Sequence, residues 1–326
     1  MPHAIHLGWK LSPQHLDWIK DQLGDDACVS QGKEIPEHTQ ILVQGRLPDE
    51  EFDRLAQLET LVIPFAGLPA ETRVQLLDRP QIQVHNLHHN ASSTAEMAIA
   101  LMLAASKRII PHDAALRQGR WMLDESPVPS SMAGKRVMIL GYGAIGQRVA
   151  RICQAMDMVV SVYKKSPPTD ASQATEGVNF LTHENWQEEL AKTDIVQLCL
   201  PGTEETHHII GAKQLEQLPQ HACIVNTGRG SLIDEEALYQ GLRSQQIGAA
   251  ALDVWWNYPK KRSEDVCLPS QFPFHELENV VLTPHRAGDL GDDSLEQRRL
   301  DELCGILRDL INGDTARNRV DVQRGY

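Results

Sequence analysis

The sequence lacks an excess of basic residues, and it lacks a long hydrophobic run. Lysine and arginine together number 31 against 44 aspartates and glutamates, which gives a net charge of −13. Because a protein that binds polyanions needs a basic face, we expect neither a nucleic-acid partner nor a membrane partner. A small anionic substrate remains compatible, since one local arginine is enough to bind a carboxylate. The most apolar stretch, residues 95–105, is too short to span a bilayer.

Closely spaced cysteine pairs and internal repeats are also missing. The sequence has six scattered cysteines and no CxxC motif, namely Cys28, Cys153, Cys199, Cys223, Cys267 and Cys304. We therefore expect reduced, mostly buried thiols and a cytoplasmic location. The first ten residues, MPHAIHLGWK, show no basic segment before an apolar core, so no secretory signal is expected.

What is present is an alternation of short apolar runs with amphipathic stretches. Continuous apolar runs predict strands buried on both faces. Ten of them occur, at residues 4–9, 41–45, 61–67, 82–87, 136–141, 159–164, 195–201, 222–228, 248–254 and 279–285. Helical patterns lie between them, for example at residues 14–23, 49–58, 144–156 and 234–244. This rhythm predicts an α/β fold with doubly wound parallel sheets, and the length of 326 residues predicts two domains.

A long helical stretch, residues 93–121, separates the first four predicted strands from the rest. It opens on STAE, in which Ser93 and Glu96 have the spacing of a helix cap. Near the end of the chain, residues 294–312 form an amphipathic helix outside the alternation. We expect this helix to pack on the first domain, with a ligand cleft between the two domains.

The clearest motif is GYGAIG at residues 141–146, which follows an apolar run and opens a helical pattern. In a dinucleotide-binding turn, Gly141 permits the tight bend, Gly143 lets the backbone approach a pyrophosphate, and Gly146 allows close packing of helix on strand. The intervening Ala144 and Ile145 would place their backbone at the phosphates. The motif predicts a Rossmann unit that binds a dinucleotide.

The acidic residue expected about 20 residues later, to bind the ribose hydroxyls, is missing. The sequence reads SVYKKSPP at residues 161–168, so Lys164, Lys165 and Ser166 follow the second strand. Because a cation binds a 2′-phosphate where a carboxylate repels it, we expect NADP to be preferred. The alternative is that the lysines are merely solvated and that NAD serves equally well.

Six segments together resemble the D-2-hydroxyacid dehydrogenase family. They are the glycine motif, NASSTAEMAIALML (90–103), CLPGTEETHHI (199–209), NTGRGSLIDEEAL (226–238), ALDVWWNYP (251–259) and ENVVLTPHRAG (278–288). A looser match is PFAGLPAE (64–71). The resemblance implies a Rossmann cofactor domain, residues 94–289, and a flavodoxin-like substrate domain, residues 1–93 with 290–326. It also implies a homodimer, for which the stretch 93–121 is a candidate contact.

The resemblance implies two catalytic residues. Arg229 would grip the carboxylate of a 2-oxo acid and polarise the adjacent carbonyl, which suits its planar fork of donors. His285 would give a proton to the carbonyl oxygen during reduction and recover it during oxidation. Further cofactor-side positions implied by the resemblance are Thr94, Pro201, Thr206, Thr227 and Asp253, the last at the nicotinamide carboxamide. Substrate-side positions are Ala66, Gly67, Leu68 and Asn90. The histidines at 88, 89, 207 and 208 are read as structural, and no metal is expected.

One position departs from the family pattern. The family places a glutamate about five residues after the aspartate, where it partners the histidine, whereas this chain has Tyr258 there. A tyrosine orients an imidazole without adding charge, so we expect a lower pKa of His285 than in a relative with the glutamate. Glu264 and Glu276 remain alternative carboxylate partners.

The leading interpretation is reduction of a small 2-oxo acid, such as glyoxylate or hydroxypyruvate, to the D-2-hydroxy acid, with NADP as the preferred cofactor and NAD as the alternative. Formate dehydrogenases are relatives with an uncharged residue at the position of Tyr258, which leaves formate oxidation as an alternative. A non-catalytic nucleotide sensor is the third. The long aromatic segment 255–274 has two possible roles, packing or substrate contact, of which we favour packing.

Overall fold

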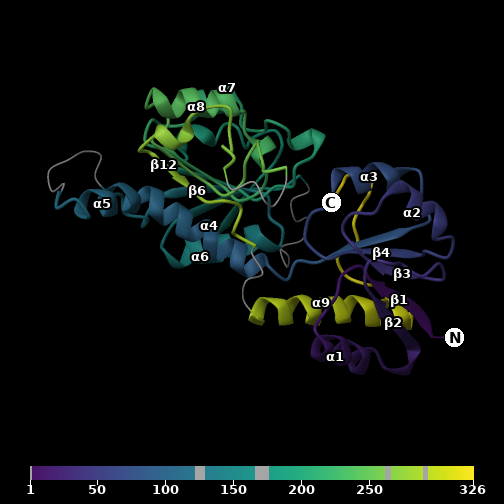
Figure 1. The fold of residues 1–326 in the computed structure, drawn as a ribbon. Helices are drawn as coiled ribbons and strands as arrows, with labels where there is room; N and C mark the ends of the chain where they lie inside the picture. Colours follow the sequence, from purple (N-terminus) through teal and green to yellow (C-terminus); the bar gives the residue numbers. More distant parts are fainter. Residues whose placement is uncertain (1, 122–128, 166–175, 261–265, 289–292) are drawn as a thin grey trace. The chain divides into compact units, whose positions relative to one another are not determined.

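The computed structural model describes residues 2–121, 129–165, 176–260, 266–288 and 293–326. Parallel strands alternate with helices along these residues, as the apolar pattern predicts (Figure 1). The chain divides into two compact units. Unit 1 comprises residues 1–90 and 290–326, and unit 2 comprises residues 91–289.

Unit 1 is built on a five-stranded parallel sheet in the order β2-β1-β3-β4-β5, which is the flavodoxin-like order. Its strands are β1 (His3–Leu7), β2 (Ala27–Gln31), β3 (Ile41–Val43), β4 (Thr60–Ile63) and β5 (Gln83–Asn86). Its helices are α1 (Pro13–Leu23), α2 (Asp49–Arg54), α3 (Ala70–Leu77) and α9 (Asp293–Asn312). Helices α1 and α9 cover one face of the sheet, and α2 and α3 cover the other (Figure 1).

Helix α1 shows how local sequence sets these elements. The Oγ of Ser12 accepts a hydrogen bond from the backbone N–H of His15, and Pro13 occupies the first turn. Gly24 ends the helix with φ of 66°. The buried side chains Ile19 and Leu23 pack in one cluster with leucines of α9, so the C-terminal helix belongs to unit 1 as predicted.

Unit 2 is built on a seven-stranded parallel sheet in the order β12-β11-β10-β9-β6-β7-β8. Its strands are β6 (Arg136–Leu140), β7 (Val159–Tyr163), β8 (Val178–Leu181), β9 (Ile195–Leu198), β10 (Cys223–Asn226), β11 (Ala249–Leu252) and β12 (Val280–Leu282). Its helices are α4 (Ala91–Ser106), α5 (Ile109–Leu116), α6 (Ala144–Ala155), α7 (Ala212–Gln217) and α8 (Glu235–Arg243). The order reverses between β6 and β9, which is the Rossmann arrangement with its switch point beside the glycine motif.

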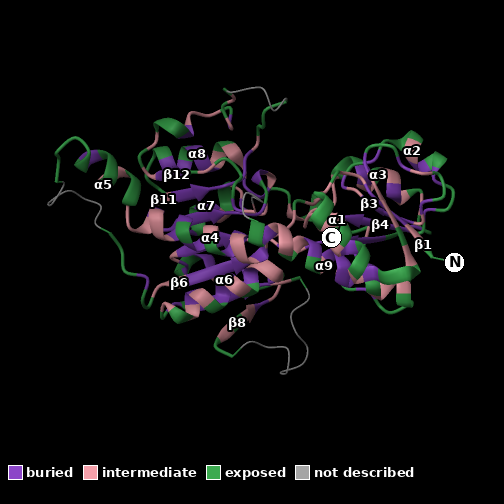
Figure 2. Ribbon diagram, turned by 60° about the horizontal axis from the view of Figure 1, so that its bottom comes forward, coloured by how far each residue is buried: buried purple, intermediate pink, exposed green. Residues whose placement is uncertain are grey.

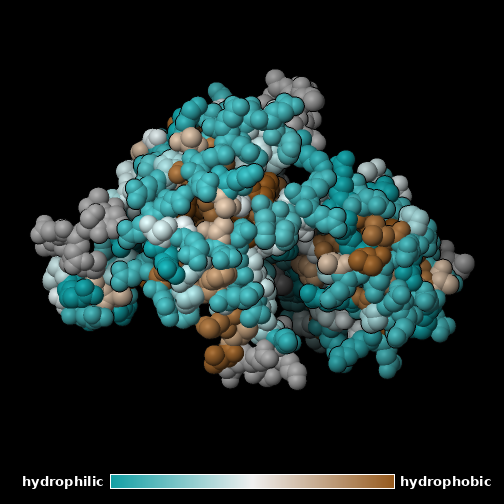
Figure 3. Space-filling view, turned by 90° about the horizontal axis from the view of Figure 1, so that it is seen from above, coloured by the Kyte–Doolittle hydropathy of each residue, from teal (hydrophilic) through white to brown (hydrophobic). Residues whose placement is uncertain are grey.

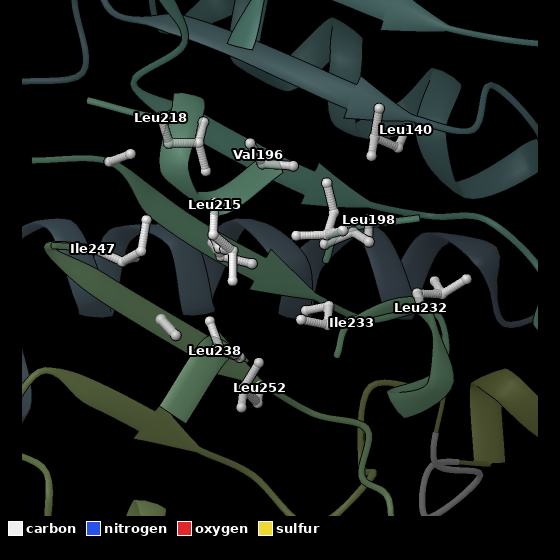
Figure 4. Close-up of a cluster of buried hydrophobic side chains, with 14 of the residues drawn as sticks. Leu140, Val196, Leu198, Leu215, Leu218, Leu232, Ile233, Leu238, Ile247 and Leu252 are labelled. Carbon is white, nitrogen blue, oxygen red and sulfur yellow. The ribbon is translucent and has the colours of Figure 1, made fainter. Parts of the chain in front are cut away.

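Two apolar layers enclose this sheet. One lies between the sheet and the helices α4 and α6, and it includes Ile139 and Val149. The other lies under α7 and α8, where Leu140, Leu198, Leu215, Leu238 and neighbouring aliphatic side chains interdigitate (Figure 4). Figure 2 shows the same burial along the strands. All seven strands therefore end at one edge of a rigid sheet, and the loops that carry the motifs leave from that edge.

The long helical stretch differs from its prediction in two ways. It is broken at Arg108, which has a left-handed backbone with φ of 52°, so α4 and α5 are separate helices. The predicted cap at Ser93 is wrong, because α4 already begins at Ala91 and the Ser93 hydroxyl donates to the carbonyl oxygen of Ala287 at 3.0 Å. The partner of the Ser93 hydroxyl is a backbone carbonyl oxygen 194 residues away in the sequence, and a four-residue pattern does not contain that information.

The aromatic segment after β11 packs on the core of unit 2. Trp255 and Phe274 are buried, and the ring of Trp256 stacks on Phe274 with centroids 5.5 Å apart. The indole N–H of Trp255 donates to the carbonyl oxygen of Thr283, and that of Trp256 donates to Ile233. Residues 261–265, which include Glu264, lie outside the described part of the chain.

The cysteines are all free, but only Cys153, Cys223 and Cys304 are buried, so the expectation of mostly buried thiols holds for half of them. Cys28 is exposed.

Among the described residues, no helix combines the length and the apolar character needed to cross a membrane. The face seen in Figure 3 is mainly hydrophilic, with a few separate hydrophobic patches.

Candidate active site

The glycine motif forms the turn between β6 and α6. Gly141 has φ of 104°, and a Cβ there would lie 2.8 Å from the carbonyl oxygen of Cys199. A Cβ on Gly146 would collide with the carbonyl oxygen of Gly141. At Gly143, by contrast, a Cβ would meet no atom within 4 Å, so the turn is open at that point. The motif therefore meets all three requirements of a dinucleotide-binding turn.

Helix α6 starts at this turn without a side-chain cap. Gly143 is the N-cap residue, and Ala144 and Ile145 form the first helical positions. The first backbone N–H groups of a helix have no partner within the helix and carry the positive end of its dipole. The phosphate site that the sequence predicts at this helix start stays a prediction.

Beyond the end of β7, the two predicted lysines differ in their surroundings. The Nζ of Lys165 lies 2.7 and 2.6 Å from the two carboxylate oxygens of Glu205. Lys164 is half-buried, and it forms no hydrogen bond or ion pair within the part of the chain that the structure describes. Ser166 lies outside the described residues. Sequence reasoning did not foresee the contact with Glu205, because 40 residues separate the partners.

The threonines predicted on the cofactor side bond within unit 2. The hydroxyl of Thr206 donates to the carbonyl oxygen of Pro201 at 2.7 Å, which closes the loop after β9. The hydroxyl of Thr227 accepts a hydrogen bond from the Nε2 of the buried Gln197 at 3.1 Å. Thr94 is buried in α4. The hydrogen bonds of Thr206 and Thr227 thus hold the chain that follows β9 and β10.

Arg229 follows β10 and precedes the short 3-10 helix η5 (Gly230–Leu232). The amide of Asn226 shapes this turn, because its nitrogen donates to the Arg229 carbonyl oxygen and its oxygen accepts from the N–H of Gly228. One guanidinium nitrogen donates to the carbonyl oxygen of Gly228 at 2.7 Å. The side chain keeps accessible surface, but the surrounding protein still desolvates the guanidinium and lowers its pKa from the usual value. It stays charged, since arginine is not deprotonated in proteins.

His285 and Tyr258 form the pair that the sequence suggested. The tyrosine Oη lies 3.0 Å from the Nδ1 of His285, and it accepts a hydrogen bond from the N–H of Trp255 at 3.1 Å. Desolvation lowers the pKa of His285, and the charge of Arg229 lowers it further, while Asp253 acts in the opposite direction. Glu276 lies in the 3-10 helix η6 (Phe274–Glu276) and makes no hydrogen bond to His285.

Asp253 holds the loop that carries His285. Its buried carboxylate accepts hydrogen bonds from the hydroxyl of Thr283 at 2.7 Å and from the N–H groups of Arg286 and Ala287 at 2.8 and 2.9 Å. Between these donors, His285 has a left-handed backbone with φ of 56°, which is uncommon for a residue with a side chain. The sequence suggested Asp253 as a cofactor residue, and this anchoring role was missed.

The residues suggested on the substrate side belong to unit 1. Ala66, Gly67 and Leu68 lie in the loop after β4, where the amide of Asn86 donates to the carbonyl oxygen of Ala66 at 2.6 Å. Asn90 is the last residue of this unit before α4. Arg229, Asp253, Tyr258 and His285 all lie in unit 2.

Comparisons with known proteins agree with this geometry. Residues 99–287 match the family model described as D-isomer specific 2-hydroxyacid dehydrogenase, NAD binding domain. A glyoxylate/hydroxypyruvate reductase of Arabidopsis thaliana is 31% identical over 250 residues, which cover 76% of this chain and 72% of that protein. A D-3-phosphoglycerate dehydrogenase of Archaeoglobus fulgidus is 30% identical over 296 residues, or 89% of this chain but 53% of that protein. The chain thus spans about half the length of that second relative.

Among solved structures, a D-isomer specific 2-hydroxyacid dehydrogenase of Xanthobacter autotrophicus, in complex with NADPH and MES, has the same fold. The TM-score is 0.81 at 24% identity, with both chains covered completely. The glycine turn, the arginine after β10 and the histidine after β12 lie within or next to the matched residues. From the family model and the fold together, it follows that this chain belongs to the D-isomer specific 2-hydroxyacid dehydrogenase family.

Proposed function

We propose that the protein is an NAD(P)-dependent D-2-hydroxyacid dehydrogenase that reduces a small 2-oxo acid of the glyoxylate or hydroxypyruvate type. The observation that carries the proposal is the hydrogen bond between Tyr258 and His285, with the Arg229 charge close enough to affect the histidine. A proton donor and a carboxylate-binding cation are the two groups that reduction of a 2-oxo acid needs from the protein.

The cofactor site is proposed from residues of unit 2, and the open turn at Gly143 fits a pyrophosphate. Its backbone groups come from Gly141, Gly143, Ala144, Ile145 and Gly146, and its side chains from Lys164, Lys165, Thr94, Pro201, Thr206, Thr227 and Asp253. When bound, the nicotinamide supplies or accepts the hydride. As substrate-side positions we propose Ala66, Gly67, Leu68 and Asn90.

Each protein group has one task in this proposal. Arg229 binds the substrate carboxylate and stabilises negative charge on the carbonyl oxygen. Because Tyr258 occupies the Nδ1 of His285, the proton that moves to or from the substrate is held on Nε2. Asp253 and the N–H of Trp255 keep this pair in place through the hydrogen bonds described above.

A substrate panel with NADPH and NADH in parallel tests the proposal. We expect glyoxylate or hydroxypyruvate to consume the reduced nicotinamide, as followed by its absorbance, and His285→Gln to lower the rate at least about 100-fold. Turnover of formate with oxidised cofactor, and of no 2-oxo acid, would instead favour the alternative that the uncharged Tyr258 suggests. Tight cofactor binding without any turnover would indicate a nucleotide sensor.

We also propose a homodimer formed through α5. Four large apolar side chains are at least half exposed here. Three lie on α5, and the fourth follows it: Ile109, Ile110, Leu116 and Trp121. Single exposed apolar residues are common, but a group on one helix indicates a contact surface. Ile110→Asp should yield a monomer in sedimentation experiments, and Val74→Asp, at an exposed position of α3, is the matched control.

For the cellular compartment we propose the cytoplasm, because all six thiols are free.

A further inference from the structure

The ion pair between Lys165 and Glu205 connects the two strands that flank the glycine motif. In the sheet, Leu140 of β6 pairs with Tyr163 of β7 on one side and with Leu198 of β9 on the other. Lys165 follows β7, and Glu205 lies in the 3-10 helix η4 (Glu204–Thr206) of the loop after β9. The pair therefore reaches across the carboxyl end of β6, where the turn at Gly141 begins.

This ion pair holds a carboxylate beside Lys165, just after β7, where the local segment SVYKKSPP contains no acidic residue. In dinucleotide-binding units that use NAD, an acidic residue at the end of the second strand binds the ribose hydroxyls. Here that position carries Lys164, but the Nζ of Lys165 holds both carboxylate oxygens of Glu205 within 2.7 Å. We propose that Glu205 is a specificity-determining residue, which accepts hydrogen bonds from the ribose of NAD and opposes the 2′-phosphate of NADP. The inference rests on the cofactor site of the proposed function.

The chemistry of the ammonium group supports this role. The ammonium of Lys165 lies 2.7 and 2.6 Å from the two carboxylate oxygens of Glu205, so a phosphate that bound the same ammonium would be held beside that carboxylate. The two groups would be about 6 Å apart, where two anions repel each other even in water. Lys165 with Glu205 is neutral as a pair, and Lys164 carries the other positive charge of this segment. The sequence SVYKKSPP thus overstates the preference for NADP.

The test measures binding of cofactor fragments and does not depend on turnover. Adenosine 2′,5′-bisphosphate and adenosine 5′-monophosphate are titrated by calorimetry into the wild type, Glu205→Gln and Glu205→Asp. In Glu205→Gln, the affinity for the bisphosphate relative to the monophosphate should rise about five- to tenfold at low salt, as the charge separation implies. Glu205→Asp keeps the charge and should stay within about twofold of the wild type.

The neighbouring residue offers a matched control. Glu204 has the same charge and is exposed, and it forms no ion pair among the described residues. Glu204→Gln should therefore change the ratio less than about twofold, and the effect of Glu205→Gln should shrink in 1 M salt, where charges are screened beyond roughly 3 Å.

Three outcomes would overturn the inference. The first is that the affinity for the bisphosphate relative to the monophosphate does not change in Glu205→Gln. The second is that this ratio falls, which would mean that Glu205 orients Lys165 for the phosphate. The third is that the ratio rises equally in Glu204→Gln. If neither fragment binds the wild type, the cofactor site itself is wrong as well. If the fragments behave as expected but no 2-oxo acid is reduced, the proposed function fails while the role of Glu205 stands.

Discussion

At the scale of single residues, the acid function of His285 depends on an uncharged partner. Burial and the charge of Arg229 both lower its pKa, and Tyr258 supplies no carboxylate to raise it. Reduction needs the protonated imidazole, so kcat/KM for reduction should fall as pH rises through a value below about 6.5, while oxidation is favoured above it. A pH profile of both directions measures this, and an acid form that persists well above pH 7 would contradict it.

Tyr258→Glu provides a sharper version of the same test. A carboxylate beside Nδ1 favours the imidazolium, so the pH at which reduction declines should move upward by about one unit. Tyr258→Phe removes the hydrogen bond without adding charge, and it serves as the control for lost packing. If the glutamate variant keeps the wild-type profile, Tyr258 does not act through the charge of His285.

Lys164 is the second residue whose chemistry can be tested by itself. Exchange for aspartate replaces a phosphate-binding cation by a group that binds the ribose hydroxyls. Lys164→Asp should shift the ratio of kcat/KM for NADPH over NADH toward NADH by about tenfold or more, given the usual strength of a charged hydrogen bond. Lys213→Asp, at an exposed position of α7, makes the same charge change and serves as the control. Equal use of both cofactors by the unmodified protein would show that Lys164 does not select between them.

At this scale the residue types of the site were predictable, and their internal bonds were not. Gly141, Arg229 and His285 sit at strand ends, where short motifs place them. The three hydrogen bonds to Asp253 join atoms 30 to 34 residues apart, and the Lys165 contact spans 40 residues. Such contacts depend on which strands become neighbours in the sheet, and a local motif carries no information about that order.

At the scale of elements, the break between α4 and α5 is a point of backbone strain. Arg108 adopts φ of 52°, a conformation that costs a residue with a side chain about 1–2 kcal/mol and costs glycine little. Arg108→Gly should therefore raise the free energy of unfolding by about 1 kcal/mol. Lys107 still donates an N–H to Leu103 in the last turn of α4, so Lys107→Gly should lower that energy by a similar amount. Urea denaturation of both variants measures the contrast, and equal signs would contradict it.

The elements that sequence reasoning missed are edge strands. Each of the ten predicted apolar runs overlaps a strand, but β2 and β8 were not predicted, and each lies at the edge of its sheet. An edge strand buries less of its surface, and the five residues of β2 include no buried one. An edge strand therefore lacks the continuous apolar run by which a central strand is predicted, and hydropathy alone does not reveal it.

At the scale of the whole molecule, unit 1 should lose stability in acid. Burial lowers the pKa of His6 and His85, and it lowers that of His89 from 6.5 to about 4. The unfolded chain binds a proton at about pH 6.5 while the folded His89 stays neutral, so its contribution is fully present above that pH and is lost as pH falls toward 4. The loss from His89 alone amounts to about 3 kcal/mol.

His89→Leu isolates this contribution. Both ring nitrogens of His89 are buried without a hydrogen-bond partner, so an apolar side chain of similar size removes a buried polar group together with the titration. Between pH 7 and 4, the variant should lose about 3 kcal/mol less stability than the wild type in urea denaturation. His38→Leu is the control at an exposed position of the same unit. Parallel curves for the wild type and His89→Leu would contradict the prediction.

Unit 1 is assembled from two stretches of chain that lie far apart in sequence. The ring of His85 contacts the carbonyl oxygen of Arg317, and the guanidinium of Arg73 donates to Val322. Helix α9 also supplies part of the apolar cluster around β1. During synthesis on the ribosome, therefore, β1 to β5 are made nearly 200 residues before the C-terminal segment that completes their unit. Unit 2 is contiguous and can fold in that interval. Unit 2 can therefore complete its fold before unit 1, although synthesis begins with unit 1.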